Sequence, residues 1–275
     1  MTAAQIIIPA HNEAHWIGDC LKSLLTQEIS GAAHVIVVAN GCTDDTARKA
    51  AQLAPDFARN GWQLTVADLP AGGKVGALNH GDGLAGAGPR VYLDADIRMQ
   101  PGLLGGIIDA LGCAAPRYAG GRLRVSQSPS KLSNIYARFW QKLPFLTQDV
   151  TGAGLFAVNE AGRARWNEFP QIISDDTYVR LHFAPAERVL VDIPYDWPIA
   201  AGAANLIKVR RRQDNGVSEI ARLYPALLEN QGHDRPGRGE LLGIARKDPV
   251  GFGVYAAIAL AVRMGRNKTN WARGR

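Results

Sequence analysis

Two pairs of aspartates are the residues whose type and spacing could most directly do chemistry. Asp94 and Asp96 are separated by one residue and follow the apolar run 91–93. Two carboxylates at the end of a strand can face one divalent cation, which can also bridge the phosphate oxygens of a ligand. An isolated Asp-x-Asp pair is equally typical of a solvated turn, so the metal-site hypothesis rests on the position of this pair after a strand.

The second pair, Asp175 and Asp176, follows the short apolar run 172–173 and precedes an apparently helical segment, 177–182. A carboxylate here could accept the proton of an attacking hydroxyl. Two acids at the start of a helix also stabilise the positive end of its dipole without any catalytic role. Because carboxylates this close can titrate as a pair, the sequence leaves open which one would carry the proton.

The elements that must position these aspartates are predicted by four short aliphatic runs, at 6–8, 35–38, 64–66 and 91–93. Each run is too short for a helix and lies between loop residues, which is typical of a buried parallel strand. Their first residues are 29, 29 and 27 positions apart, the length of a βα unit. Helical spacing over 17–25 and capping residues at 43–46 predict helices in the gaps. We therefore expect an α/β fold with an open, doubly wound, mostly parallel sheet flanked by helices.

Ligands of such sheets bind beyond the carboxyl ends of the strands. The segments that follow the four predicted strands are polar, and they are 9–13, 39–44, 72–74 and 94–96. We expect one cleft there, containing a lysine and several acids. The dinucleotide, P-loop and nucleophile-elbow motifs are missing, which disfavours NAD enzymes, P-loop ATPases and α/β hydrolases. Three cysteines without C-x-x-C spacing indicate neither a disulfide framework nor a cysteine zinc site.

Together these motifs resemble those of the family 2 glycosyltransferases, which have the GT-A fold, over residues 6–216. The family's opening P-x-x-N-E is matched from Pro9, and its G-K-x-x-A-L-N segment is matched from Gly73. Segment 40–46 is similar to the family's G-S-T-D-x-T turn, but Asn40 stands where members usually carry an acid. The resemblance implies a nucleotide-sugar donor bound by Pro9, Asn12, Glu13, Asn40, Lys74, Asp94 and Arg212.

The second half of the chain resembles the same family. Gly152 and Gly154 look like the glycine loop on the acceptor side, and segment 174–176 looks like the catalytic acidic pair. By this resemblance Asp176 is the general base and Asp175 its neighbour. The same resemblance implies a divalent metal, Mg²⁺ or Mn²⁺, held by Asp96 with the assistance of Asp94.

The basic run 208–213 lies where processive members of the family carry Q-x-x-R-W. Arg212 matches the arginine, which implies a cation near the leaving diphosphate; a solvated helix face is the alternative. Val209 and Gln213 replace the glutamine and the tryptophan. This departure argues for transfer of a single sugar rather than for polymerisation.

The implied activity is that of an inverting, metal-dependent glycosyltransferase of the hexosyltransferase type (EC 2.4), acting on a sugar or on a lipid-linked or envelope acceptor. Metal and cations would neutralise the leaving diphosphate, and a base would accept the proton of the acceptor hydroxyl. Two enzymatic alternatives stay open, a polyprenyl-phosphate glycosyltransferase and, more distantly, a sugar nucleotidyltransferase. A membrane-bound scaffold is the non-enzymatic alternative, and the four aspartates argue against it.

The polar segment 231–239, rich in Gly and Pro, is predicted to be a linker. We expect a catalytic domain at 1–230, with a nucleotide-sugar half at about 1–100 and an acceptor half at about 101–230, and a helical tail at 240–275. Within the catalytic domain, apolar and aromatic residues at helical spacing over 130–145 predict a core helix. An acceptor-side platform is the alternative interpretation of that helix.

Most of the net charge of +6 resides in the tail, because residues 1–239 carry 24 basic and 23 acidic side chains whereas 240–275 carry 7 and 2. Since no basic face or nucleic-acid-binding motif is evident, we expect no nucleic-acid partner. The uncharged run 250–262 is too short to span a membrane. Segment 250–275 is predicted either to contact an anionic membrane surface or to pack on the domain.

The start of the chain has no basic region of the kind that opens a signal peptide. We therefore expect a cytoplasmic protein, which the tail can hold peripherally at the inner face of the cell membrane.

Overall fold

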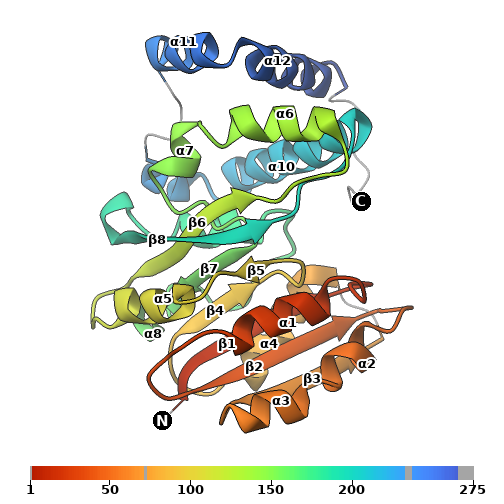
Figure 1. The fold of residues 1–275 in the computed structure, drawn as a ribbon. Helices are drawn as coiled ribbons and strands as arrows, with labels where there is room; N and C mark the ends of the chain where they lie inside the picture. The colour runs from red at the N-terminus through yellow and green to blue at the C-terminus, as the bar shows by residue number, and fades with distance from the viewer. Residues whose placement is uncertain (1, 71–72, 233–236, 266–275) are drawn as a thin grey trace.

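The structure, a computed structural model, describes residues 2–70, 73–232 and 237–265 (Figure 1). Parts of the expected linker at 231–239 and of the expected tail at 240–275 therefore lie outside the described residues. The described part of the chain contains one eight-stranded sheet, in the order β3-β2-β1-β4-β7-β6-β8-β5.

The first half of the sheet is parallel. β1 pairs with β2 on one side and with β4 on the other, and β3 pairs with β2. The strands contain the four aliphatic runs of the sequence and span Thr2–Ala10 (β1), Ala32–Asn40 (β2), Gln63–Leu69 (β3) and Arg90–Leu93 (β4). The predicted α/β fold with a doubly wound, mostly parallel sheet is confirmed.

The second half of the sheet mixes both orientations. β7 is antiparallel to β4 and to β6, β8 is parallel to β6, and β5 is antiparallel to β8. These strands span Arg98–Met99 (β5), Tyr118–Val125 (β6), Leu155–Val158 (β7) and Arg188–Trp197 (β8). The switch to antiparallel pairing brings the loop that precedes β7 beside the carboxyl end of β4.

Helices cover both faces of the sheet, because successive side chains of a strand point to opposite sides. Ile6 and Ile8 of β1 belong to one apolar cluster with Ile17, whereas Ile7 belongs to a second cluster with Leu78. The helices of this half span Ile17–Leu25 (α1), Thr46–Ala51 (α2), Ala54–Arg59 (α3), Gly73–Leu84 (α4) and Leu103–Leu111 (α5). The helices predicted at 17–25 and after 43–46 are α1 and α2.

The remaining helices of the described residues follow β6 in the chain. They span Lys131–Trp140 (α6), Pro144–Thr147 (α7), Glu160–Arg163 (α8), Asp175–Arg180 (α9), Ala203–Leu223 (α10), Arg238–Lys247 (α11) and Pro249–Met264 (α12), with short 3₁₀ turns at Pro185–Glu187 and Pro225–Asn230.

The predicted helix in 130–145 is α6, and it packs against α12. Ser130 accepts a hydrogen bond from the backbone N–H of Ser133 and so caps α6. The rings of Tyr136 and Tyr255 stack with centroids 5.7 Å apart. The side of α6 that faces α12 is packed in the core, as the default interpretation of this aromatic helix predicts.

α12 is held to the rest of the protein by contacts near both of its ends. Asp248 caps its N-terminus through the N–H of Gly251 and pairs with Arg138 at 2.7 Å. Arg211 donates to the carbonyl oxygen of Ala261 at the other end, at 2.7 Å. The described part of the tail therefore packs on the rest of the protein, which is one of the two arrangements predicted for segment 250–275.

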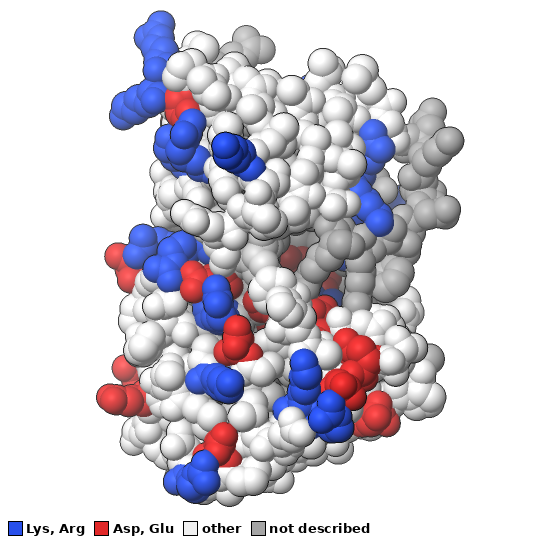
Figure 2. Space-filling view, turned by 45° about the vertical axis from the view of Figure 1, so that its right-hand side comes forward, with Lys and Arg blue, Asp and Glu red and all other residues white. Residues whose placement is uncertain are grey.

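Only one side of α12 is buried. Leu260 and Met264 are 58% and 76% exposed. In the upper part of Figure 2, a white, uncharged area lies between Lys and Arg side chains on either side. Among the described residues, no helix combines the length and apolar character that crossing a bilayer requires.

Candidate active site

The loops after β1 and β2 interlock. Asn12 adopts a positive φ of 54°, and its Oδ1 accepts a hydrogen bond of 2.8 Å from the backbone N–H of Thr43. The N–H of Glu13 donates to Oγ1 of Thr46 at 2.7 Å. The motif that begins at Pro9 and the turn at 40–46 are therefore hydrogen-bonded to each other at the carboxyl ends of adjacent strands. Pro9 itself is buried within β1.

Asn40 is the last residue of β2, and its side-chain oxygen can still accept a hydrogen bond. Its side chain is buried, and Nδ2 donates to the carbonyl oxygen of Gly73. Its Oδ1 has no hydrogen-bond partner among the described residues. A buried carbonyl oxygen without a partner is costly in free energy unless a ligand satisfies it.

Lys74 joins the two acidic pairs of the sequence. Its Nζ lies 2.9 Å from Oδ1 of Asp94 and 3.1 Å from Oδ2 of Asp175. The lysine comes from the first turn of α4, Asp94 follows β4, and Asp175 opens α9. A lysine and an aspartate from each acidic pair are therefore in contact at this edge of the sheet.

Burial and neighbouring charges both shift the pKa values of Asp175 and Lys74. Burial raises the pKa of Asp175 to about 6; the Lys74 ammonium opposes this shift, and the carboxylates of Asp176 and Asp94 add to it. Burial lowers the pKa of Lys74, but the same three carboxylates outweigh it and raise this pKa above its usual value. Lys74 is therefore a permanent cation among acids.

Asp176 is held by its own turn and stays partly exposed. Its Oδ1 accepts hydrogen bonds from the N–H of Thr177 at 2.7 Å and from Oγ of Ser174 at 3.1 Å. Gly152 approaches from the other side: a Cβ built there would lie 3.5 Å from Cβ of Asp176 and would collide with the Tyr118 hydroxyl. The φ of Gly152 is +74°, which also favours glycine.

Asp94 and Asp96 lie on the turn after β4, next to the second glycine of the loop. The N–H of Asp94 donates to the carbonyl oxygen of Gly154 at 2.8 Å. Asp96 is only 8% exposed. Burial raises the pKa of the nearby Cys20 thiol, and the carboxylates of Asp96, Asp94 and Glu13 raise it further. Negative charge is thus concentrated around this turn.

The residues of this turn fit a divalent ion whose remaining ligands come from a substrate. The described part of the chain holds no group of three His, Cys, Asp or Glu side chains arranged around one metal position. Two neighbouring carboxylates are nevertheless the ligand set with which Mg²⁺ is held when phosphate oxygens and water complete its coordination.

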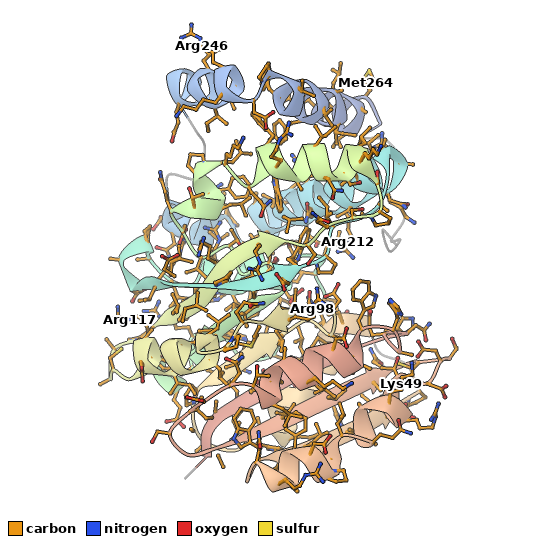
Figure 3. The ribbon with its side chains drawn as sticks, viewed as in Figure 1. Lys49, Arg98, Arg117, Arg212, Arg246 and Met264 are labelled. Carbon is orange, nitrogen blue, oxygen red and sulfur yellow. The ribbon has the colours of Figure 1, made fainter. Side chains whose placement is uncertain are left out.

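Arg212 lies on α10, exposed to solvent (Figure 3). Gly216, one turn later on the same face of the helix, packs against Ser174, and a Cβ at that glycine would lie 2.8 Å from Cβ of Ser174. Arg212 is therefore one helical turn from the loop that carries the acidic pair. It makes no direct contact in the group formed by Lys74, Asp94 and Asp175.

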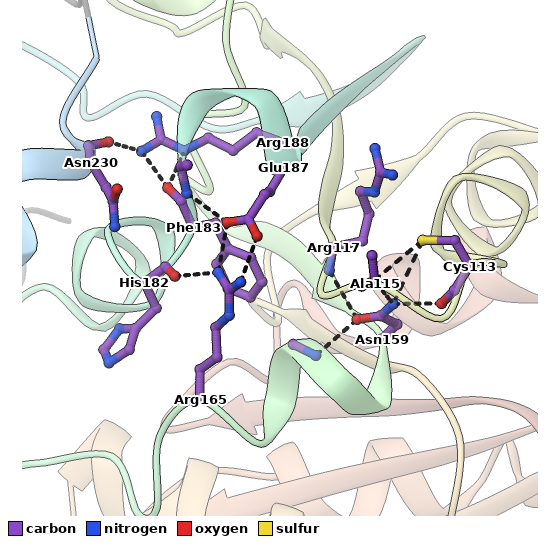
Figure 4. Close-up of polar contacts among 12 residues, drawn as sticks. Cys113, Ala115, Arg117, Asn159, Arg165, His182, Phe183, Glu187, Arg188 and Asn230 are labelled. Atoms are coloured by element: carbon purple, nitrogen blue, oxygen red, sulfur yellow. Dashed lines mark hydrogen bonds and ion pairs between the residues drawn. The ribbon is translucent and has the colours of Figure 1, made fainter.

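A polar network fixes the far end of α9 (Figure 4). Arg165 donates to the carbonyl oxygen of His182 at 2.6 Å and pairs with Glu187. Arg188 donates to the carbonyl oxygens of Phe183 and Asn230. The helix that carries Asp175 and Asp176 is thereby anchored to β8 and to the 3₁₀ turn that precedes the predicted linker.

Sequence reasoning missed the tyrosines behind the glycine loop. Tyr195 donates from its hydroxyl to the carbonyl oxygen of Ala153 at 2.8 Å, and the buried Tyr118 hydroxyl lies against Gly152. Each tyrosine is more than 30 residues from the loop along the chain, so no local pattern could have revealed these contacts.

The family described as glycosyl transferase family 2 matches residues 5–164, which is more than half of the chain. No curated protein matches the sequence.

Solved structures share the fold at low sequence identity. A mannosyltransferase from Pyrobaculum calidifontis, in complex with GDP-Man and Mn²⁺, superposes with a TM-score of 0.57 at 18% identity, over 98% of this chain and 76% of that one. TarS 1–349 from S. aureus, in complex with UDP-GlcNAc, has a TM-score of 0.51 at 15% identity, over 95% and 82%.

A longer TarS structure has a TM-score of 0.52 at 16% identity, over 91% of this chain and 43% of that one. The present chain thus spans less than half the length of that protein. These neighbours are GT-A glycosyltransferases, and the GT-A fold predicted from the motifs is confirmed. On the match to its sequence and on this fold, the chain belongs to glycosyl transferase family 2.

Proposed function

We propose that this family 2 glycosyltransferase is an inverting, metal-dependent enzyme that moves a single sugar from a nucleotide-sugar donor to an acceptor hydroxyl. The observation that carries this proposal is the bridge from Asp94 through Lys74 to Asp175. It gathers both acidic pairs and a cation at one edge of the sheet, where a donor diphosphate and an acceptor can meet.

The loops after β1 and β2 form the donor side. Asn12 and Glu13 shape the loop, and the unused Oδ1 of Asn40 can accept an N–H of the nucleotide base. Lys74 and Arg212 supply positive charge for the diphosphate. The neighbours in complex with GDP-Man and UDP-GlcNAc support a nucleotide-sugar donor.

Asp96 and Asp94 would hold Mg²⁺ or Mn²⁺ together with the donor phosphates. When bound, this ion would neutralise the negative charge that develops on the departing nucleoside diphosphate. Lys74 contributes to the same neutralisation from the protein side, and its fixed contact with Asp94 keeps both groups in place.

Asp176 is the better placed of the two acids to serve as general base. Asp175 is buried and engaged by Lys74, whereas Asp176 is partly exposed and its hydrogen bonds from described residues fall on Oδ1. Its Oδ2 can therefore accept the proton of an acceptor hydroxyl that attacks from the side opposite the diphosphate. Such a displacement inverts the anomeric carbon without a covalent enzyme intermediate.

We also propose that the enzyme works at the inner face of the cell membrane, held peripherally by its last helices, on a sugar or on a lipid-linked or envelope acceptor. Exposed apolar side chains support this, namely Leu242, Val250, Leu260 and Met264, with the basic residues Arg246, Lys247 and Arg263 on the same two helices. Arg246 and Met264 lie at the outer edge of the molecule in Figure 3. An apolar face bordered by cations is what an interfacial helix needs.

The division into a catalytic domain at 1–230, a linker at 231–239 and a tail at 240–275 stays a prediction. Ile258 and Val262 of α12 belong to the apolar core, so the described part of the tail also stabilises the acceptor half. A polyprenyl phosphate as acceptor remains the second candidate, because its ionised oxygen would need no base.

Thermal unfolding in the presence of nucleotides tests the proposal. A ligand at one hundred times its dissociation constant adds about 2.7 kcal/mol to the free energy of unfolding. We expect UDP or GDP to raise the unfolding temperature with Mn²⁺ and much less with a chelator, and Asp96→Ala to lose the metal-dependent part. Asp109→Ala, an exposed aspartate of α5, is the matched control. Equal stabilisation with and without metal in the unaltered protein would contradict the metal assignment.

A further inference from the structure

The acidic pair follows a segment that has no regular structure of its own. Residues 164–174 lie between α8 and α9 and belong to neither a helix nor a strand. Ser174 occupies the N-cap position of α9, but its side chain caps no backbone N–H of that helix and donates instead to Oδ1 of Asp176. The position of Asp176 therefore depends on contacts that hold this segment from outside.

The end of the segment farther from the acidic pair is fixed to α4, the helix that carries Lys74. Asn79, the asparagine of the matched G-K-x-x-A-L-N motif, makes two hydrogen bonds with the backbone of Phe169. Its Nδ2 donates to the carbonyl oxygen at 3.0 Å, and its Oδ1 accepts from the N–H at 2.7 Å. The buried ring of Phe169 also packs on Tyr92 of β4, with ring centroids 5.3 Å apart.

The end next to the acidic pair is held by α10. Oε2 of Glu219 accepts a hydrogen bond of 2.8 Å from the backbone N–H of Ile173. Gly216, one turn earlier on the same face of α10, allows the helix to approach this closely. A Cβ at that glycine would lie 2.8 Å from Cβ of Ser174 and 3.2 Å from Cγ2 of Ile173.

The two ends of the segment are anchored by different means. Phe169 is 2% exposed and is held by apolar packing as well as by Asn79, whereas the side chain of Ile173 is 39% exposed. Ile173 therefore gains little fixation from the apolar core. A hydrogen bond is directional, and a carboxylate acceptor makes it shorter and stronger than a neutral one. Glu219 is thus well suited to fix the end that leads into the acidic pair.

We infer that Glu219 is a positioning residue for sugar transfer. By holding the N–H of Ile173, it sets where Ser174 and Asp176 lie relative to the donor side of the site. The inference rests on the proposed function for the role of Asp176 as the general base. Glu219 acts through the backbone, and a misplacement of a reacting group by about 1 Å is enough to lower a rate about 10²-fold.

Kinetics of the full chain tests the inference. Release of UDP from UDP-GlcNAc or of GDP from GDP-Man, with Mn²⁺ and with water in place of the acceptor, measures kcat. Glu219→Ala should lower kcat by about tenfold to a hundredfold. The dissociation constant of UDP or GDP and the unfolding temperature should change little, because the donor loops keep their contacts.

Two further variants separate positioning from a general effect on the fold. Glu219→Gln should restore most of kcat, since its amide oxygen can still accept the N–H of Ile173. Ser218→Ala alters the neighbouring exposed residue of α10 and is the matched control, with an expected kcat equal to that of the unaltered protein.

Backbone hydrogen exchange gives a readout that needs no substrate. Glu219→Ala should speed exchange in peptides that cover 170–174 and leave the donor-side turn at 40–46 unchanged. Four results would overturn the inference: unchanged exchange at 170–174, unchanged kcat in Glu219→Ala, an equal loss of kcat in Glu219→Gln, or a fall in kcat matched by an equal fall in nucleotide affinity. If the unaltered protein neither binds UDP or GDP nor releases them from the sugar nucleotides, the proposed function fails. The exchange measurement then decides separately whether Glu219 holds the segment.

Discussion

The Nζ atom of Lys74 lies 3.1 Å from Oδ2 of Asp175 and so connects the first turn of α4 with the first turn of α9. The two residues are about one hundred positions apart in the sequence and come from the two halves of the sheet. The same ammonium contacts Asp94 at 2.9 Å. One cation therefore links the carboxyl end of β4 to the start of α9.

Asp175 is expected to make stability depend on pH. Burial, reinforced by Asp176 and Asp94 and opposed by Lys74, raises its pKa to about 6, above the value of about 4 in an unfolded chain. Between these two values the folded protein binds more protons than the unfolded chain, so the free energy of unfolding falls as the pH rises through this window. The contribution is at most about 3 kcal/mol.

Urea unfolding of the unaltered protein and of Asp175→Asn from pH 4 to pH 7 checks this expectation. The stability of the variant relative to the unaltered protein should increase with pH. Asp192→Asn, which alters an aspartate whose side chain is 86% exposed, should show a constant difference. A constant difference for Asp175→Asn would show that its pKa is ordinary.

Asp176→Asn is expected to lose sugar transfer but to keep its fold and its affinity for the donor. The amide has nearly the same shape but cannot accept the proton, and removal of a general base typically lowers kcat by about 10² to 10⁴. Steady-state kinetics with a hydroxyl acceptor measures the effect. If Asp175→Asn is the inactive variant and Asp176→Asn is near normal, the two roles are reversed. Transfer to a phosphate acceptor that survives Asp176→Asn would favour the polyprenyl-phosphate alternative.

Gly152→Ala is expected to reduce both stability and transfer. Its φ of +74° strains any residue with a Cβ, and the new methyl group would collide with the Tyr118 hydroxyl and contact Asp176. A loss of about 1–3 kcal/mol in the free energy of unfolding is typical for such strain. Gly243→Ala, in α11 with open space around it, should instead be neutral or stabilising by up to about 1 kcal/mol. Similar effects of the two changes would refute the argument from the glycine loop.

The exposed side of α12 is expected to bring the protein to anionic membranes. Flotation with anionic liposomes at low salt should carry the full chain into the lipid fraction, and higher salt should weaken this because it screens the basic residues. Leu260→Glu combined with Met264→Glu should prevent flotation. Val217→Glu, at an exposed valine of α10, should not. If the unaltered protein stays in the soluble fraction at low salt, α12 serves only to stabilise the acceptor half.

Elements whose signals lie in neighbouring residues were predictable before the structure was known. The four aliphatic runs became β1 to β4, and the helical spacing over 17–25 became α1, because strand and helix periodicity are written in neighbouring residues. The order of the motifs along the chain also identified the family. Each motif follows a predicted strand. Because parallel strands have their carboxyl ends at one edge of the sheet, the motifs were expected to lie close together there.

Tertiary structure decided what the local patterns left open. The contact of Lys74 with Asp175, the packing of Gly152 against Tyr118, and the packing of Trp140 on Trp197 each join residues distant in sequence. For the segment after 250, the sequence allowed packing or membrane contact, and the fold buries one side of α12 while exposing the other. The physical reason is that burial, and with it the pKa of Asp175, depends on which segments the folded chain brings together, which no single stretch of sequence specifies.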